Sequence, residues 1–218
     1  LTKQRKVKDI AASSLKPKKF AQLIFRMVNY YQPDTILELG TSLGITTSYL
    51  ASAKNNSLVT TMEGSSAVAN VAQKNFNSLN LKNITIVEGN FDTTLAATLQ
   101  QIQKVDFAFI DGNHRYQPTI NYFQELLPFI HEESIVIFDD IHWSKEMEQA
   151  WDAIKKHPSV KLSIDLFFIG IVFFKKELLS LQADKPEENQ ESIWHQIVCV
   201  TLEQVIKISE GSCLTFVF

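Results

Sequence analysis

The sequence predicts an α/β protein whose doubly wound, mainly parallel sheet of seven strands closes with a C-terminal antiparallel hairpin. The first observation is a series of short β-branched or aromatic runs, separated by stretches long enough for a crossover helix. These runs are residues 35–39, 58–62, 84–88, 105–110 and 134–138. The second observation is a later change of pattern. Residues 160–165 and 169–174 leave no room for a helix between them and therefore indicate a hairpin.

Helical patterns fill the gaps between the runs. They cover residues 18–30, 45–53, 66–79, 94–103, 118–127 and 145–156. The first has apolar residues near helical spacing, and Ser65 or Ser66 is a favourable N-cap for the third. Pro118 suits a first helical turn, and His157-Pro158 favours a stop after the last helix.

The chain divides into three predicted parts. Residues 1–34 are an N-terminal basic helical segment, residues 35–176 a ligand-binding domain, and residues 177–218 a tail without evident chemistry. Eight bases against one acid in residues 1–26 fit a solvated segment, or alternatively a lid or acceptor-binding helix. The tail fits a structural cap or, alternatively, a partly disordered segment, with a polar stretch followed by helical periodicity.

The composition excludes several classes of protein. A length of 218 residues with 45% hydrophobic and 21% charged residues suits a globular domain with a sizeable core. A net charge of -3 makes a nucleic-acid partner unlikely, and two cysteines make no disulfide framework. We find neither a membrane-spanning run nor a signal peptide pattern, so we expect a cytoplasmic protein without a membrane partner.

The glycines are few, and their positions are informative. The chain has 7 glycines, where average usage would give about fifteen. Those that follow predicted parallel strands are Gly40, Gly44, Gly64, Gly89 and Gly112. Ligands of doubly wound sheets bind outside the carboxyl ends of the strands, where glycine lets the backbone approach them. We therefore expect a nucleoside-binding rim at this edge.

The residues along this rim resemble those of class I S-adenosylmethionine-dependent methyltransferases. The resemblance covers about residues 18–176 and starts from ILELGTSLG at 36–44, which is similar to the family's first motif. It implies a Rossmann-like methyltransferase fold with S-adenosylmethionine as cofactor. The cofactor-binding residues that it implies are Glu38, Gly40, Thr41, Ser42, Gly44, Glu63, Gly64, Ser65, Asn90, Phe91 and Asp111. Glu63 matches the acid that holds the ribose, whereas Asn90 departs from the usual Asp at the adenine.

Within the family, two strings look most like small-molecule O-methyltransferases of the catechol type and of the antibiotic-sugar type with D-G-x-H-x-Y. They are IDGNHRY at 110–116 and FDD at 138–140. The resemblance implies that Asp111, Asp139 and Asp140 hold a divalent metal such as Mg²⁺. Asp140 stands where the catechol type has Asn, and His114 stands where it has Lys. The catalytic residues that we expect are His114 and Asp111.

This set of residues suits methyl transfer to a hydroxyl. Carboxylates are the ligands that Mg²⁺ prefers, and a hydroxyl bound to Mg²⁺ loses its proton more easily. A nearby His114 can accept that proton near neutral pH. Alternatively, Asp139 and Asp140 cap the following helix or bind the acceptor, His114 only orders its loop, and His142 is a second ligand or base. Trp143 and Tyr116 are candidates for an acceptor pocket.

The favoured function is therefore an S-adenosylmethionine-dependent O-methyltransferase acting on a small molecule with a hydroxyl. A nicotinamide-dependent reductase is disfavoured, because none of the five tyrosines has a Lys four positions later. Methylation of a nucleic-acid base is disfavoured because residues 111–114 read DGNH, where such enzymes carry [D/N]-P-P-[Y/F]. A non-catalytic S-adenosylmethionine-binding protein is the remaining alternative. The edge hairpin and the tail are candidate homodimer surfaces.

Overall fold

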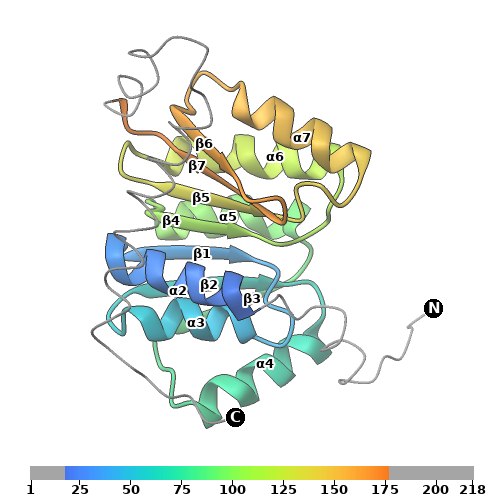
Figure 1. Ribbon diagram of the computed structural model, residues 1–218. Coiled ribbons are helices and arrows are strands. Elements are labelled where there is room, and N and C mark those ends of the chain that lie inside the picture. The colour runs from blue at the N-terminus through green and yellow to red at the C-terminus, as the bar shows by residue number, and fades with distance from the viewer. Residues whose placement is uncertain (1–17, 177–218) are drawn as a thin grey trace, which may run out of the picture.

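The computed structural model describes residues 18–176, within which seven strands form one sheet in the order β3-β2-β1-β4-β5-β7-β6 (Figure 1). The strands are β1 (Thr35–Leu39), β2 (Leu58–Glu63), β3 (Ile84–Glu88), β4 (Phe107–Ile110), β5 (Ile135–Asp139), β6 (Leu162–Asp165) and β7 (Ile169–Phe173). The first five pair in parallel, and β7 is antiparallel to both β5 and β6. The predicted doubly wound sheet with a closing hairpin is thereby confirmed.

Helices cover both faces of this sheet. They are α2 (Lys18–Tyr31), α3 (Ile45–Ala53), α4 (Ser66–Ser78), α5 (Phe91–Ile102), α6 (Tyr116–Leu126), the 3-10 turn η1 (Leu127–Phe129) and α7 (Lys145–Lys155). One apolar cluster joins α2 and α3 to the face that is turned forward in Figure 1. A second cluster joins α5, α6 and α7 to the opposite face. Burial on both faces explains why the central strands are almost continuously apolar.

Several predicted element boundaries are wrong by one to three residues, and two of the differences bear on the site. The helix expected at 94–103 begins at Phe91, because the Asn90 side chain accepts a hydrogen bond from Asp92 N at 3.2 Å and caps it. The strand expected to end at 138 continues through Asp139, which pairs with Ile169. Asp139 is therefore the last strand residue rather than the first loop residue.

Differences of one or two residues also occur elsewhere, four of them as follows. The helix expected from Pro118 begins at Tyr116, so the proline lies within the first turn. The strands expected from 105 and 160 begin at Phe107 and Leu162. The helix expected to end at 156 ends at Lys155, one residue earlier. The first of these shifts moves Tyr116, a candidate for the acceptor pocket, from the loop into the first turn of α6.

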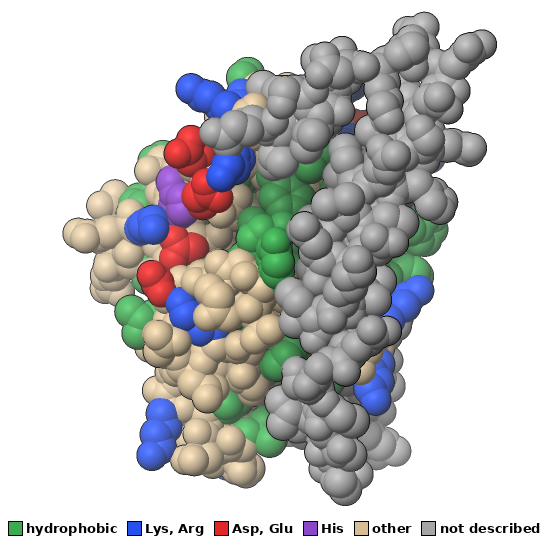
Figure 2. Space-filling model, turned by 60° about the vertical axis from the view of Figure 1, so that its left-hand side comes forward, with side chains coloured by type: hydrophobic (Ala, Val, Ile, Leu, Met, Phe, Trp, Pro, Cys, Tyr) green, Lys and Arg blue, Asp and Glu red, His purple; other side chains and the backbone are tan. Residues whose placement is uncertain are grey.

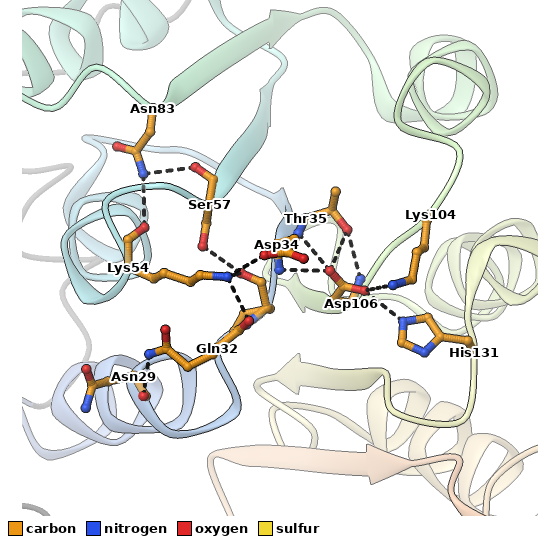
Figure 3. A network of polar contacts seen from close by, with 11 residues as sticks. Asn29, Gln32, Asp34, Thr35, Lys54, Ser57, Asn83, Lys104, Asp106 and His131 are labelled. Carbon is orange, nitrogen blue, oxygen red and sulfur yellow. Dashed lines mark hydrogen bonds and ion pairs between the residues drawn. The ribbon is translucent and has the colours of Figure 1, made fainter.

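The amino ends of β1 and β4 are joined by the carboxylate of Asp106 (Figure 3). Its Oδ2 accepts hydrogen bonds from Asp34 N and Thr35 N, each at 2.9 Å. Its Oδ1 lies 2.8 Å from both Lys104 Nζ and His131 Nε2. Burial alone would raise the pKa of Asp106, but these donors outweigh it and hold the pKa far below its usual range.

Lys54 closes the same end of the sheet beside β2. Its Nζ donates to Gln32 O at 2.9 Å and lies 2.5 Å from Asp34 Oδ1 (Figure 3). The surface turned forward in Figure 2 shows acidic and basic side chains and a histidine close to apolar ones. Strands β1 to β5 all begin at this end, and the polar network stabilises the sheet there. Their carboxyl ends, where ligands of such sheets bind, lie at the opposite end.

Helix α2, which precedes the predicted boundary between residues 34 and 35, packs directly against the sheet that follows it. Phe20, Ile24 and Val28 of α2 are buried in the same cluster as β1 and β4. The remainder of the predicted basic segment, residues 1–17, and the whole tail 177–218 lie outside the described residues. Among the helices of residues 18–176, none is long and apolar enough to cross a membrane.

Candidate active site

The loop after β1 is pressed against the loop after β4. Gly40 has a φ of +106°, and a Cβ added to it would lie 2.1 Å from the carbonyl oxygen of Asp111. Gly40 N and Thr41 N both donate to Met62 O at 3.0 Å, which draws the same loop toward β2. Only glycine fits this position, because any side chain would collide with the loop after β4.

Glu63 bridges the loops after β1 and β2. Its Oε2 accepts a hydrogen bond from Ser42 N and its Oε1 accepts one from Ser65 N, both at 2.9 Å. Each carboxylate oxygen keeps a further lone pair, so the side chain can still accept two hydroxyls. The predicted ribose acid thus lies at the carboxyl end of β2 with its orientation set by backbone N–H groups. Gly64 and Ser65 extend from it along the exposed rim.

Glu38 lies beneath this loop rather than at its surface. The side chain is fully buried, and its Oε2 accepts hydrogen bonds from Thr47 Oγ1 and, at 2.6 Å, from Thr61 Oγ1. Thr61 Oγ1 is also 2.6 Å from Thr41 Oγ1. The carboxylate therefore supports the glycine turn from below and links it to α3 and β2. Gly44, with a φ of +78°, begins α3 at the same place.

Asn90 and Phe91 face the loop after β4 from the start of α5. The Phe91 ring lies so close to Gly112 that a Cβ there would be 2.5 Å from its Cε2. Phe91 also packs edge-on to Tyr122, with ring centroids 6.0 Å apart. The carbonyl oxygen of Asn90 caps α5, yet it has a second lone pair for another donor. Both residues predicted at the adenine thus lie beside the predicted ribose and catalytic loops.

Three candidate residues converge at the carboxyl ends of β4 and β5. One ligand atom from each of Asp111, His114 and Asp139 lies within 4.8 Å of the others. His114 Nε2 is 3.5 Å from Asp111 Oδ1 and 3.9 Å from Asp140 Oδ2. Asp139 is almost fully buried, whereas Asp111 and Asp140 are partly exposed. The structure therefore groups His114 with Asp111 and Asp139, and Asp140 lies beside them.

The acids determine the charge state of His114. Burial alone lowers its pKa, but the hydrogen bond and charge of Asp111, followed by the charges of Asp140 and Asp139, raise the pKa above 6.5. Protonated His114 is thus stabilised by carboxylates in a partly buried site. An imidazole in this setting is well suited to accept a proton from a hydroxyl beside it.

The alternative role of the acidic pair as a helix cap is wrong for α7. Ser144 caps that helix, its Oγ accepting a hydrogen bond from Met147 N at 3.2 Å. Asp140 has a φ of +52°, a conformation uncommon for residues other than glycine. The carbonyl oxygen of Asp140 accepts a hydrogen bond from Trp143 N at 2.9 Å. Capping of α7 therefore does not account for the two carboxylates.

His142 is directed to a different partner. Its Nε2 lies 2.9 Å from Asp165 Oδ2, and its Nδ1 lies 3.5 Å from Glu148 Oε1. The ring thereby ties the loop after β5 to the hairpin of β6 and β7. This arrangement makes His142 a linking residue and gives no support to the alternative of a second base.

The residues present fit both groups that the resemblance implies. The close approach at Gly40 and the Glu63 carboxylate fit a nucleoside lying across the loops after β1 and β2. The carboxylates of Asp111, Asp139 and Asp140 offer the oxygen donors that Mg²⁺ prefers. His114 offers nitrogen, which suits Mg²⁺ less well than Mn²⁺, Fe²⁺ or Zn²⁺.

Sequence reasoning missed a polar chain that supports the site. Asn113 Nδ2 donates to Tyr122 Oη at 3.0 Å, and Tyr122 Oη donates to Asp92 Oδ1 at 2.7 Å. Burial first, and the Asp92 carboxylate with it, raise the pKa of Tyr122 to about 12, despite an opposing contact from Asn113. This chain ties the loop after β4 to α5 and α6. The string at 110–116 pointed to Asn113, but no signal pointed to a tyrosine inside the next helix.

Comparison with known proteins agrees with this geometry. Residues 37–141 match a family model described as a methyltransferase domain. They include the glycine turn, Glu63, Asn90 and the complete acid and histidine cluster. A curated relative, an uncharacterized protein of Acanthamoeba polyphaga mimivirus, is 35% identical over 52 residues. That match spans only 24% of this chain and 24% of the relative's length.

Solved structures share the fold. An O-methyltransferase from Bacillus cereus in complex with S-adenosylhomocysteine is 22% identical, with a TM-score of 0.60 over 79% of this chain and 92% of that one. The O-methyltransferase TomG from Streptomyces achromogenes, in complex with S-adenosylmethionine, is 15% identical, with a TM-score of 0.65 over 80% and 92%. A Podospora anserina methyltransferase bound to S-adenosylhomocysteine has a TM-score of 0.67 at 15% identity, over 75% and 81%. At these identities the likeness establishes the Rossmann-like methyltransferase fold.

Proposed function

Because residues 37–141 match the model of a methyltransferase domain, we propose that the protein transfers a methyl group from S-adenosylmethionine to a hydroxyl oxygen of a small molecule. The observation that carries the proposal is the contact between its two loops. Gly40 of the cofactor loop lies against the Asp111 carbonyl, and Asp111 belongs to the acid and histidine cluster. A cofactor on the first loop therefore lies next to an acceptor held at the second, as in-line transfer requires.

On the cofactor side, Glu63 would accept the ribose hydroxyls while Ser42 N and Ser65 N hold its carboxylate in place. Phe91 would pack near the adenine, and the free lone pair of Asn90 Oδ1 would accept from its amine. Thr41, Gly44 and the buried Glu38 would keep the glycine turn in its shape. These roles follow from position, since every one of these residues lies at the carboxyl end of a strand or at the start of a helix.

On the acceptor side, Asp111, Asp139 and Asp140 would hold a divalent cation, with His114 as the base. A divalent cation, when bound, lowers the pKa of a hydroxyl coordinated to it. Because Mg²⁺ favours oxygen over nitrogen ligands, His114 is the group in this cluster left to accept the acceptor's proton. Asp111 Oδ1 lies 3.5 Å from His114 Nε2, and this contact would then orient the ring and stabilise the imidazolium.

Two measurements test the proposal. Isothermal titration with S-adenosylhomocysteine should show one site, and turnover of S-adenosylmethionine should appear with catechol-like or sugar acceptors and fall with EDTA. His114→Gln should lower kcat by at least about 100-fold while S-adenosylhomocysteine affinity stays within twofold. Binding without turnover for any acceptor would favour the non-catalytic alternative, and absence of binding would overturn the cofactor assignment. A cytoplasmic location and a homodimer stay predictions.

A further inference from the structure

The buried hydroxyl of Tyr122 lies between two segments that the proposed reaction has to bring together. Tyr122 belongs to α6, and its side chain is 1% exposed. Its Oη accepts a hydrogen bond from Asn113 Nδ2 at 3.0 Å and donates one to Asp92 Oδ1 at 2.7 Å. The hydroxyl therefore uses both its acceptor and its donor capacity, and its two partners come from different parts of the site.

The first partner, Asn113, belongs to the loop after β4, residues 111–115. It lies two residues after Asp111 and directly before His114, which lie 3.5 Å apart at Asp111 Oδ1 and His114 Nε2. Asn113 has a φ of +61°, a conformation that asparagine adopts more readily than most residues. Because Asn113 and His114 are adjacent, a displacement of Asn113 also displaces the backbone of the expected base.

The second partner, Asp92, belongs to the start of α5. Its backbone N–H donates to Asn90 Oδ1 at 3.2 Å. Phe91, between these two residues, packs edge-on against the Tyr122 ring with centroids 6.0 Å apart. We call Asn90, Phe91 and Asp92 the adenine segment, because the first two are the residues expected at the adenine. The ring and the hydroxyl of Tyr122 thus contact two successive residues of this segment.

The direction of each hydrogen bond in the chain is determined by its chemistry. Burial raises the pKa of Tyr122 to about 12, so its hydroxyl keeps its proton near neutral pH. The amide nitrogen of Asn113 can only donate, and the Asp92 carboxylate can only accept. Hydrogen bonds to a charged acceptor are the stronger ones, and bonds in series polarise one another. The chain therefore holds the loop after β4 in a defined position relative to α5.

The loop after β4 depends on such contacts for its position. Asn113 and Arg115 are exposed, and exposed loop segments are the parts of a fold that open most readily. A second contact involves the same two segments, since a Cβ on Gly112 would lie 2.5 Å from Cε2 of Phe91. The loop thus lies against the adenine segment directly at Gly112 and through Tyr122 at Asn113.

We propose that Tyr122 is a positioning residue, which transmits the binding of the cofactor at the adenine segment to the loop after β4. This inference rests on the proposed function, because it takes the place of the adenine and the role of His114 from it. Adenine bound against Phe91 would restrict the start of α5, and Tyr122 would then hold Asn113 and, next to it, His114. A loop ordered in this way loses less entropy when the acceptor binds.

Hydrogen–deuterium exchange of the full chain, with and without S-adenosylhomocysteine, tests the inference. In the unmodified chain the ligand should slow exchange at residues 40–44 and 63–65, which report binding, and at residues 111–115, which report transmission. Tyr122→Phe keeps the ring against Phe91 and removes only the hydroxyl. It should reduce the slowing at 111–115 by at least about half, while S-adenosylhomocysteine affinity stays within about threefold.

Two substitutions of Asp92 separate transmission from a purely structural role. Asp92 is exposed, so we expect both variants to fold. Asp92→Ala removes the acceptor of the Tyr122 hydroxyl and should give the same loss of slowing as Tyr122→Phe. Asp92→Asn keeps an acceptor oxygen and should preserve the slowing. Combining Asp92→Ala with Tyr122→Phe should cause no further loss, because both changes break the same chain.

Tyr49→Phe is the matched control. It removes the same hydroxyl from a ring that packs on Phe25 of α2, whereas Tyr122 belongs to the apolar cluster on the opposite face of the sheet. The slowing at residues 111–115 should therefore be the same in Tyr49→Phe as in the unmodified chain.

Three results would overturn the inference while S-adenosylhomocysteine binding stays intact. They are undiminished slowing at residues 111–115 in Tyr122→Phe, absence of that slowing in the unmodified chain, and equal losses in Asp92→Ala and Asp92→Asn. The last result would attribute the effect to the charge of Asp92 rather than to the hydrogen bond. Absence of S-adenosylhomocysteine binding to the unmodified chain would instead overturn the proposed function, and the inference with it.

Discussion

The Glu63 carboxylate shows how one side chain can prepare a ligand site before the ligand arrives. Ser42 N and Ser65 N occupy one lone pair on each of its oxygens, so its rotamer is held by two loops at once. Each oxygen keeps a further lone pair that can accept a hydroxyl. A side chain held in this way loses little entropy when the ligand binds.

Glu63→Gln should therefore weaken S-adenosylhomocysteine binding by about tenfold or more. The amide places an N–H₂ where a carboxylate oxygen accepts a backbone hydrogen bond, and it removes the charge that strengthens hydrogen bonds to hydroxyls. Calorimetric titration measures the loss. Glu88→Gln is the control, because Glu88 is the exposed register partner of Glu63 on β3. Equal effects of the two substitutions would contradict the assignment of Glu63.

Asp106 predicts a pH dependence of stability at the opposite end of the sheet. Its folded pKa lies below the unfolded value of about 3.9, so its contribution is fully present above that pH and is lost as the pH falls further. Asp106→Asn should cost about 2 kcal/mol of unfolding free energy at pH 7. The difference in unfolding free energy between the variant and the unmodified chain should decrease progressively below pH about 4.

Urea denaturation at pH 7 and pH 3 measures that gap. Asp152→Asn is a suitable control, since the exposed Lys155–Asp152 pair also lowers the pKa of Asp152 but contributes little in water. Its effect should stay within about 0.5 kcal/mol at both pH values. A constant gap for Asp106→Asn at both pH values would show that its hydrogen bonds do not depend on the charge.

At the scale of elements, the contact between the loops after β1 and β4 depends on one glycine. Gly40→Ala should cost about 3 kcal/mol, because the new Cβ would meet the Asp111 carbonyl at 2.1 Å and the φ is +106°. Gly64→Ala is the control, since the nearest atom to its Cβ is Gly89 O at 4.0 Å. That change should stay within about 0.5 kcal/mol. Thermal denaturation of both variants measures the difference, and similar midpoints would argue against a required close approach.

The same loops show what the sequence could predict. Short apolar runs located every strand of the described residues, because this signal is local. The predicted start of α5 was wrong because Asn90 was expected to bind adenine and was not considered as a helix cap. The grouping of His114 with Asp111 and Asp139 depends on the distance between β4 and β5, which no local pattern specifies.

Non-local contacts account for the residues that were missed. Tyr122 belongs to the support of the site only because α5 and α6 lie side by side on one face of the sheet. Phe167 and Phe168 are expected in a hairpin, but their exposure follows from the strained turn between β6 and β7. Hydrophobic patterning favours burial for both rings, and the structure reverses that preference at the edge of the site.

At the scale of the whole molecule, α2 packs in the same apolar cluster as the sheet, although the sequence analysis placed a boundary after residue 34. Ile24 and Val28 of α2 are fully buried, and they pack in one cluster with Ile36 of β1 and Phe107 of β4. Phe20 connects the same helix to Phe168 in the turn between β6 and β7. A helix that contributes to both the core and the border of the site should unfold together with the sheet.

Ile24→Ala tests this cooperativity. Removal of a fully buried side chain from the shared cluster should cost about 3 kcal/mol and lower the thermal midpoint by roughly 10 °C. If α2 is part of the same unit, far-ultraviolet circular dichroism and tryptophan fluorescence should report one coincident transition at the lower midpoint. Asn29→Ala, on the exposed side of α2, should leave the midpoint unchanged within about 2 °C. An early transition of helical signal, with tryptophan fluorescence unchanged, would instead make α2 an independent segment that is not part of the cooperative unit of the sheet.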